Sequence, residues 1–376
     1  MKHRERVLTI LEHKEADRIP LDCGSVGNLI VDEVYFKIKD ILEIKENIEP
    51  YRSGSTANYY DERILEEFDV DFRHLWFASK DKPKPMKNPD GTVTDEWNIT
   101  WSREGSYPTI FPLKNAKLKE IENFKWPFPA KNWDISKLVQ RAENLYKNTD
   151  YAIVAKAVMG GGGILERSYY LRSIDDLFMD MSVNKEVAHY IINKVTEIEI
   201  ALWDIYLKAI GPYVHIIQRA SDLGTQLGLL MSPKMYTEFL KPAEIKIISH
   251  IKKLAPKAKI WFHSCGAIAE LIDDFIDIGI DILNPVQPLA KGMDSFSLKK
   301  RYGKKLVFHG GIDLQKALPG SIEEVKKEVE TRIKAFGHDG GYILAPANHI
   351  QSDTPPENVI FLYKYAKEYG KYPLKT

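Results

Sequence analysis

The chain has 376 residues, 44% hydrophobic and 28% charged, a composition typical of a globular protein with a large core. Lysine plus arginine equals aspartate plus glutamate at 53 each, so no basic field favours nucleic-acid binding. The N-terminal segment lacks an apolar signal core, no run of about 18 apolar residues occurs, and the two cysteines are too few for a disulfide framework. These features predict a cytoplasmic protein with reduced thiols and no membrane association.

Strand and helix patterns alternate along the chain. Residues 80–115 interrupt the alternation, because the Asp90-Gly91 turn lies between the β-rich segments 92–94 and 97–101, which predicts an inserted β-hairpin. The expected strands are 18–24, 71–77, 152–158, 214–218, 260–262, 282–283, 306–308 and 342–344. The expected helices are 2–15, 31–46, 60–68, 185–210, 232–254, 266–278, 294–302, 321–336 and 356–369.

Eight strands with intervening helices favour a closed parallel (β/α)8 TIM barrel over a doubly wound sheet, which has fewer strands and a phosphate-binding turn. We therefore predict one α/β domain over residues 1–376, with an N-terminal helical extension and the hairpin insertion at about 80–115. The run Gly160–Gly163 is not followed by the Lys-Ser or Lys-Thr pair of a phosphate loop and is expected to be a turn at the mouth of the site.

The active site of such a barrel lies at the carboxyl ends of the strands, so the polar residues there belong to one rim. In strand order they are Asp22, Cys23, Asn28, His74, Trp76, Lys156, Glu166, Arg219, Asp222, His263, Cys265, Asn284, Gln287, His309, Asp313, Asn348 and His349. Within this set His263 and Cys265 stand two residues apart at the end of a buried strand. Imidazole nitrogen and thiolate sulfur are preferred zinc ligands, although a histidine at a strand end beside an inert cysteine is the alternative.

Three groups of segments resemble the uroporphyrinogen decarboxylase superfamily. They are Ser221–Gln226 with Ser232-Pro233 and Tyr236; His263–Gly266 with Asp281–Gln287; and His309–Asp313 with Gly341–Ile350 and Asp353–Asn358. The resemblance is strong over about residues 150–370, is looser before them, and implies a (β/α)8 barrel.

The resemblance implies either decarboxylation of a porphyrinogen or methyl transfer. The decarboxylase pattern has paired arginines after the first strand to hold substrate carboxylates, whereas Leu21–Asn28 has no arginine and carries Asp22. The methyltransferase branch resembles this chain at His263 and Cys265, where its zinc binds. Its third ligand, a cysteine after the eighth strand, is replaced by Asn348, so His349, Glu166 or Asp222 would have to substitute.

We therefore predict a zinc-dependent methyltransferase that moves a methyl group from a small methylated substrate, such as a methyl ether or methylamine, to a corrinoid protein. The chain has no Asp-x-His-x-x-Gly motif, so the corrinoid is expected on a partner; a homodimer is left open. The expected metal ligands are His263, Cys265 and His349; the expected catalytic residues are Asp222, Arg219, His349 and Glu166; the expected substrate-binding residues are Asn28, Trp76, Gln287 and Asn348.

Two alternatives remain. One is a metal-free carboxy-lyase of the uroporphyrinogen decarboxylase type, in which Asp222 and His349 transfer protons at a pyrrole. The other is a catalytically inactive barrel that only binds a corrinoid or porphyrin-like ligand.

Overall fold

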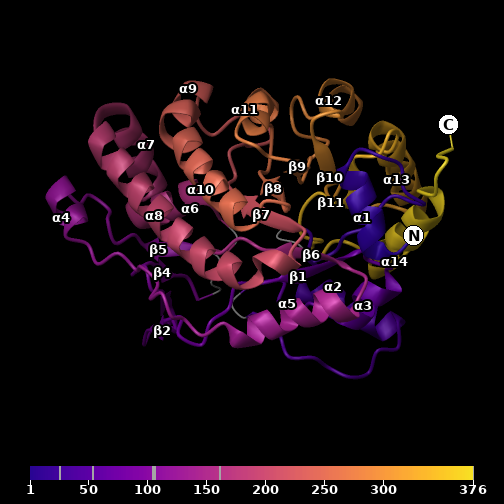
Figure 1. The fold of residues 1–376 in the computed structure, drawn as a ribbon, viewed down its shortest axis with the longest axis horizontal. Helices are drawn as coiled ribbons and strands as arrows, with labels where there is room; N and C mark the ends of the chain where they lie inside the picture. The colour runs from indigo at the N-terminus through magenta and orange to yellow at the C-terminus, as the bar shows by residue number, and fades with distance from the viewer. Residues whose placement is uncertain (25–26, 53–54, 104–106, 161, 376) are drawn as a thin grey trace.

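The computed structural model describes residues 1–24, 27–52, 55–103, 107–160 and 162–375. Ser25 and Val26 of the first predicted turn, and Gly161 of the glycine run, lie outside the described residues. The centre of the molecule is a curled, seven-stranded parallel sheet with the order β1-β6-β7-β8-β9-β10-β11 (Figure 1). Its strands are β1 (Phe72–Leu75), β6 (Ala152–Ala155), β7 (Ile216–Ala220), β8 (Lys259–His263), β9 (Ile282–Asn284), β10 (Val307–Ile312) and β11 (Tyr342–Pro346).

The predicted first strand is not a regular strand, which corrects the expectation of eight. It forms isolated bridges, among them a parallel one between Leu21 and Leu344 of β11. Leu344 N–H donates to the carbonyl of Pro20 at 2.9 Å, and Asp71 N–H, just before β1, donates to the carbonyl of Leu21 at 2.9 Å. This segment therefore lies between the two edge strands of the sheet. Pro20 has no N–H to donate, which limits a regular ladder here.

Helices cover the outside of the sheet (Figure 1). They are α1 (His3–Leu11), α2 (Asp32–Ile41), α3 (Glu62–Glu67), α4 (Leu118–Glu122), α5 (Ser136–Asn148), α6 (Ile164–Arg172), α7 (Ile174–Val183), α8 (Lys185–Ile210), α9 (Pro233–Met235), α10 (Lys241–Leu254), α11 (Ile272–Asp277), α12 (Ser295–Tyr302), α13 (Ile322–Phe336) and α14 (Pro356–Tyr369). From α8 onward each predicted run contains a helix, although α11 begins at Ile272, well after the predicted start at residue 266, whereas α4 to α7 were not predicted. In the described part of the chain, no helix has both the length and the apolar character needed to cross a bilayer.

The insertion is larger than the predicted hairpin. It is a four-stranded antiparallel sheet of β2 (Met86–Lys87), β3 (Val93–Thr94), β4 (Thr100–Trp101) and β5 (Pro108–Ile110). The two segments expected to face each other are indeed paired, with Val93 opposite Trp101 and Thr94 opposite Thr100.

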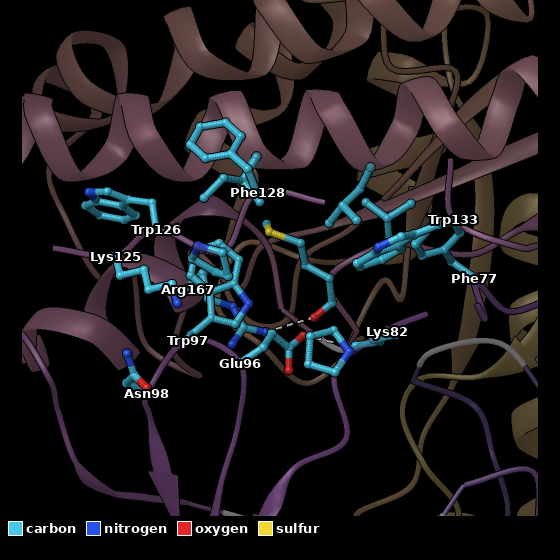
Figure 2. Close-up of a pocket in the computed structure, with 16 residues that line it drawn as sticks. Phe77, Lys82, Glu96, Trp97, Asn98, Lys125, Trp126, Phe128, Trp133 and Arg167 are labelled. Atoms are coloured by element: carbon cyan, nitrogen blue, oxygen red, sulfur yellow. Dashed lines mark hydrogen bonds and ion pairs between the residues drawn. The ribbon is translucent and has the colours of Figure 1, made fainter. Parts of the chain in front are cut away.

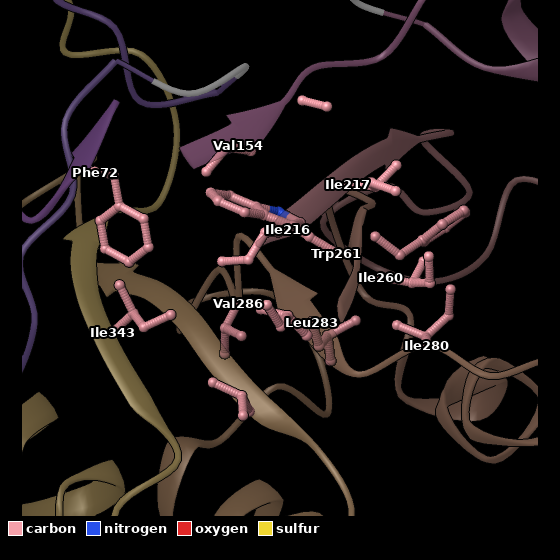
Figure 3. Packing of buried hydrophobic residues seen from close by; sticks show 14 of the residues in the cluster. Phe72, Val154, Ile216, Ile217, Ile260, Trp261, Ile280, Leu283, Val286 and Ile343 are labelled. Atoms are coloured by element: carbon pink, nitrogen blue, oxygen red, sulfur yellow. The ribbon is translucent and has the colours of Figure 1, made fainter. Parts of the chain in front are cut away.

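Alternation of side chains along the parallel strands decides which residues face the interior of the curled sheet. Trp261 is fully buried and packs there near Val154 and Ile216, whereas Ile217 and Ile260 belong to the outer face (Figure 3). His263 lies two residues beyond Trp261 and therefore shares its face, at the carboxyl end of β8. The polar residues of the site lie next to this layer of apolar side chains, at the carboxyl ends of the strands.

Candidate metal centre

Asp222, His263 and Cys265 each bring one potential ligand atom to a cluster in which these atoms lie within 4.8 Å of one another. Nε2 of His263 lies 3.5 Å from Sγ of Cys265 and 3.6 Å from Oδ1 of Asp222. Asp222 follows β7 and the other two residues belong to the end of β8, the neighbouring strand. The expectation that Asp222 and His263 share one pocket is confirmed. We call this group the Asp222–His263–Cys265 cluster.

The cluster is open to solvent on the side of Asp222, whose side chain is 47% exposed, while the side chain of His263 is 6% exposed. Burial raises the pKa of the Cys265 thiol well above its usual range, and the negative charge of Asp222 raises it further. Asn348 opposes this effect through its amide, which donates to Sγ at 3.4 Å. A bound cation would reverse the balance, because it stabilises the thiolate.

A buried hydrogen-bond chain links the cluster to Asp22. Oδ1 of Asp22 lies 2.9 Å from Nε2 of His74, and Oδ2 lies 2.9 Å from Nε2 of His309. Nδ1 of His309 lies 2.7 Å from the amide nitrogen of Asn284, and the amide oxygen of Asn284 lies 2.5 Å from Nδ1 of His263. All five were named among the rim residues, but nothing in the sequence indicated that they form one chain.

These contacts fix a consistent set of donors and acceptors. Burial alone would raise the pKa of Asp22, but His74 and His309 hold it well below its usual range, so its carboxylate accepts from both imidazoles. Burial lowers the pKa of both histidines, which favours their neutral forms. His309 then accepts from the Asn284 amide, and His263 donates its Nδ1 proton to Asn284. The lone pair on Nε2 of His263 is left facing Cys265 and Asp222, as a metal ligand requires.

Gly27, in the segment that leads to α2, lies directly against the ring of His263. Gly27 has a φ of +90°, and a Cβ at this position would lie 2.4 Å from Cε1 of the His263 ring. Only glycine allows both this conformation and this approach. Two residues further on, Leu29 N–H donates to Nδ1 of His349 at 3.0 Å.

Glu166 supports the backbone around Asp222. Its carboxylate accepts from Gly163 N–H at 2.7 Å, from Ser221 Oγ at 3.0 Å and from Asp222 N–H at 2.5 Å. Burial, followed by the charge of Asp222, raises the pKa of Glu166 to about 7. Glu166, which was predicted to be catalytic, thus contacts the cluster through the backbone N–H of Asp222.

Of the four residues predicted to bind substrate, Asn348 contacts the cluster directly. Asn28 is buried and its amide lies 3.3 Å from Oδ2 of Asp22. Gln287 accepts from Gly266 N–H at 2.9 Å, and Asn348 contacts Cys265 as described above. The ring of Trp76 lies 4.5 Å from Nζ of Lys156.

Two predicted roles are corrected by these positions. Among the described residues, Asp222, and not His349, stands with His263 and Cys265, because the ring of His349 is held by Leu29 N–H. Arg219 lies within β7, which extends beyond its predicted end, and faces the helices outside the sheet. It forms ion pairs with Glu199 of α8 and, at 2.6 Å, with Glu244 of α10. Arg219 therefore joins the outer face of the sheet to the surrounding helices and has a structural role.

A separate cavity of about 350 Å³ lies between the small sheet and α8. Figure 2 shows its aromatic lining, which includes Trp97, Trp126 and Trp133, with Arg167 beside them. The cluster residues do not line it, so this cavity is distinct from the candidate metal centre.

The fold and the cluster define a parallel α/β protein with a candidate metal centre at the carboxyl ends of its strands. The family model for uroporphyrinogen decarboxylase (URO-D) matches residues 153–369. The chain belongs to the URO-D family.

Curated relatives share the name uroporphyrinogen decarboxylase. The protein of Trichodesmium erythraeum is 28% identical over 183 residues, covering 49% of this chain and 48% of the relative. The protein of Rickettsia felis is 30% identical over 164 residues, covering 41% and 44%. The chain spans about half the length of the curated relatives it matches.

Among solved structures, a methyltransferase from Methanosarcina mazei has a similar fold over nearly its whole length. The TM-score is 0.68 and the sequence identity 18%, with 98% of this chain and 99% of that chain covered. This likeness supports the fold from end to end, including the part before residue 153 that the family model does not match.

Proposed function

We propose that this chain is a zinc-dependent methyltransferase that passes a methyl group from a small methylated substrate to a corrinoid carried by a partner protein. The observation that carries the proposal is the Asp222–His263–Cys265 cluster, which offers one carboxylate, one imidazole and one thiol beside solvent. In this proposal residues 1–376 act as one barrel domain, and the two free cysteines agree with a cytoplasmic location.

The residues present fit zinc. Nitrogen, sulfur and oxygen donors are its usual ligands, and three protein ligands leave a position for substrate. The lone pair on Nε2 of His263 faces the other two donors, while Nδ1 is held by Asn284 at 2.5 Å. When bound, zinc would supply a Lewis acid for the heteroatom that carries the methyl group, or would favour a thiolate.

The surrounding residues position this cluster. Glu166 holds the main chain of Asp222, and Asn348 donates to Sγ of Cys265 at 3.4 Å. The Asp22 carboxylate fixes the orientation of His309 and, through Asn284, that of His263. We propose that Asn28, Trp76 and Gln287 bound the space in which the substrate lies.

The proposal is tested by metal content and methyl transfer in one set of variants. Protein purified without chelators is expected to hold about one zinc per chain and to methylate cob(I)alamin from a member of a panel of methyl ethers and methylamines. Cys265→Ser is expected to lose most of the zinc and the activity. Cys23→Ser, the matched change at the other free cysteine, is expected to retain both. Absence of stoichiometric metal from the unaltered protein contradicts the proposal.

A second candidate is a metal-free carboxy-lyase acting on a porphyrinogen, which the names of the curated relatives favour. Asp222 would then act on protons at a pyrrole. Turnover of uroporphyrinogen by protein stripped of metal, lost in Asp222→Asn, would support this candidate over methyl transfer.

A further inference from the structure

Lys156 is a buried cation at the carboxyl end of the sheet. The backbone N–H of Lys156 continues the pairing with β1 beyond the end of β6, because it donates to the carbonyl of Leu75 at 2.9 Å. Lys156 lies two residues after Val154, which pairs with His74. Alternation therefore turns Lys156 to the face of the sheet that carries His74. The residue is 1% exposed, and Nζ donates to the carbonyl of Gly24 at 3.1 Å.

Among the described residues, no carboxylate contacts Nζ of Lys156 directly. In the described part of the chain, no carboxylate oxygen lies within the 4.0 Å that defines an ion pair with its Nζ. Burial and then the charge of Arg52 hold the pKa of Lys156 well below its usual range, with Asp22 opposing them. Asp22 does not neutralise the ammonium directly, because its two oxygens are hydrogen-bonded to His74 and His309.

Arg52 is a second cation in the same region. Its guanidinium lies 5.3 Å from the ring of Tyr51. The rings of Tyr51 and Trp76 lie 4.4 Å apart, and the ring of Trp76 lies 4.5 Å from Nζ of Lys156. Among the described residues, these contacts thus run from one basic side chain through two aromatic rings to the other. Burial, and then the charges of Arg52 and Lys156, also lower the pKa of His349 to about 3.

Lys156 and His263 contact two glycines that are three residues apart in the sequence. Gly24 accepts the hydrogen bond from Lys156, and Gly27 lies against the ring of His263. A small molecule that contacts Lys156 is therefore held near the side of the barrel mouth where His263 lies.

We infer that Lys156 and Arg52 bind an anionic group, a carboxylate or a phosphate, of the methyl donor. Burial without a carboxylate in contact disfavours the ammonium form of Lys156, and a substrate anion that binds beside it would stabilise that form. The inference rests on the proposed function in one respect: the molecule that carries the anion is taken to be the methyl donor. The charge of Asp22 is directed toward two histidines and not toward this anion.

The test is calorimetric binding of 4-methoxybenzoate, monomethyl phosphate and the neutral methoxybenzene to the purified protein. At least one anion is expected to bind about tenfold or more tightly than methoxybenzene. Lys156→Met is expected to remove that preference, Arg52→Met to weaken it and Lys156→Arg to retain most of it. Lys299→Met is the matched control, because Nζ of Lys299 also donates to a glycine carbonyl, that of Gly340 at 2.6 Å.

The zinc content of each variant separates this inference from the proposed function. Lys156→Met is expected to keep the zinc content of the unaltered protein. Equal affinity for anions and methoxybenzene, no binding of either anion, or an unchanged preference in Lys156→Met would overturn the inference. Lys156-dependent anion binding by a protein that holds no zinc would support the inference and contradict the proposed function.

Discussion

The amide oxygen of Asn284 lies 2.5 Å from Nδ1 of His263, on the strand next to that of the histidine. The two residues are paired in register between β8 and β9, so the contact follows from the sheet itself. Because the same amide donates to His309, a single side chain sets the proton positions of two imidazoles.

We predict that Asn284→Leu lowers zinc affinity by about 10- to 100-fold, since it removes the acceptor that orients His263. Asn284→Asp restores an acceptor and is expected to recover most of the affinity. Competition titration with a chelator measures both, and thermal unfolding checks that the variants fold. A leucine variant that binds zinc as tightly as the unaltered protein would remove Asn284 from this role.

Replacement of Arg219 is expected to affect stability and not the metal centre. Arg219→Met leaves Glu199 and Glu244 buried without their partner and is predicted to lower the free energy of unfolding by about 3–5 kcal/mol. Adding Glu199→Gln and Glu244→Gln should recover part of the loss. Urea denaturation measures the change in unfolding free energy. A large fall in the zinc affinity of the folded variant would contradict a purely structural role for Arg219.

Acid is expected to destabilise the protein through His215. Burial and then the charge of Arg4 lower the pKa of His215 to about 4, and its Nδ1 accepts from Ile153 N–H at 3.0 Å. The folded state therefore binds fewer protons than the unfolded state below about pH 6.5, so stability present above that pH is lost as the pH falls toward 4. We predict a loss on the order of 2 kcal/mol from this group, discounted for its partial exposure.

Unfolding measured at pH 7 and pH 4 tests this prediction. His215→Gln should reduce the difference in unfolding free energy between the two pH values. The same change at the exposed His338 should leave the difference as it is. Equal pH dependence in all three proteins would exclude His215 as the cause.

The sequence predicted those parts of the fold whose signals are local. The helix Lys185–Ile210 and the helix Pro356–Tyr369 have the predicted bounds because their apolar periodicity runs from end to end. Arg219 was misplaced because β7 continues to Ala220, two residues beyond the predicted strand end, so a residue of the outer face was read as part of the rim.

The connections within the site could not be predicted from local patterns. His309 and Asp22 are 287 residues apart and His349 and Leu29 are 320 apart, so their contacts depend on the closing of the sheet. Asp222 lies beside His263 because β7 and β8 are neighbouring strands, whereas Nδ1 of His349 accepts from the backbone N–H of Leu29. Local spacing did bring His263 and Cys265 together as candidate ligands, because they lie two residues apart at the end of β8.

The most direct test of the account is X-ray absorption at the zinc edge of the purified protein. A zinc ion bound by Asp222, His263 and Cys265 is expected to show one sulfur ligand at about 2.3 Å and nitrogen and oxygen ligands at about 2.0–2.2 Å. The sulfur is expected to disappear in Cys265→Ser and to persist in Cys23→Ser. A zinc shell without sulfur, or protein without stoichiometric zinc, would contradict the assignment of Asp222, His263 and Cys265 as a metal centre.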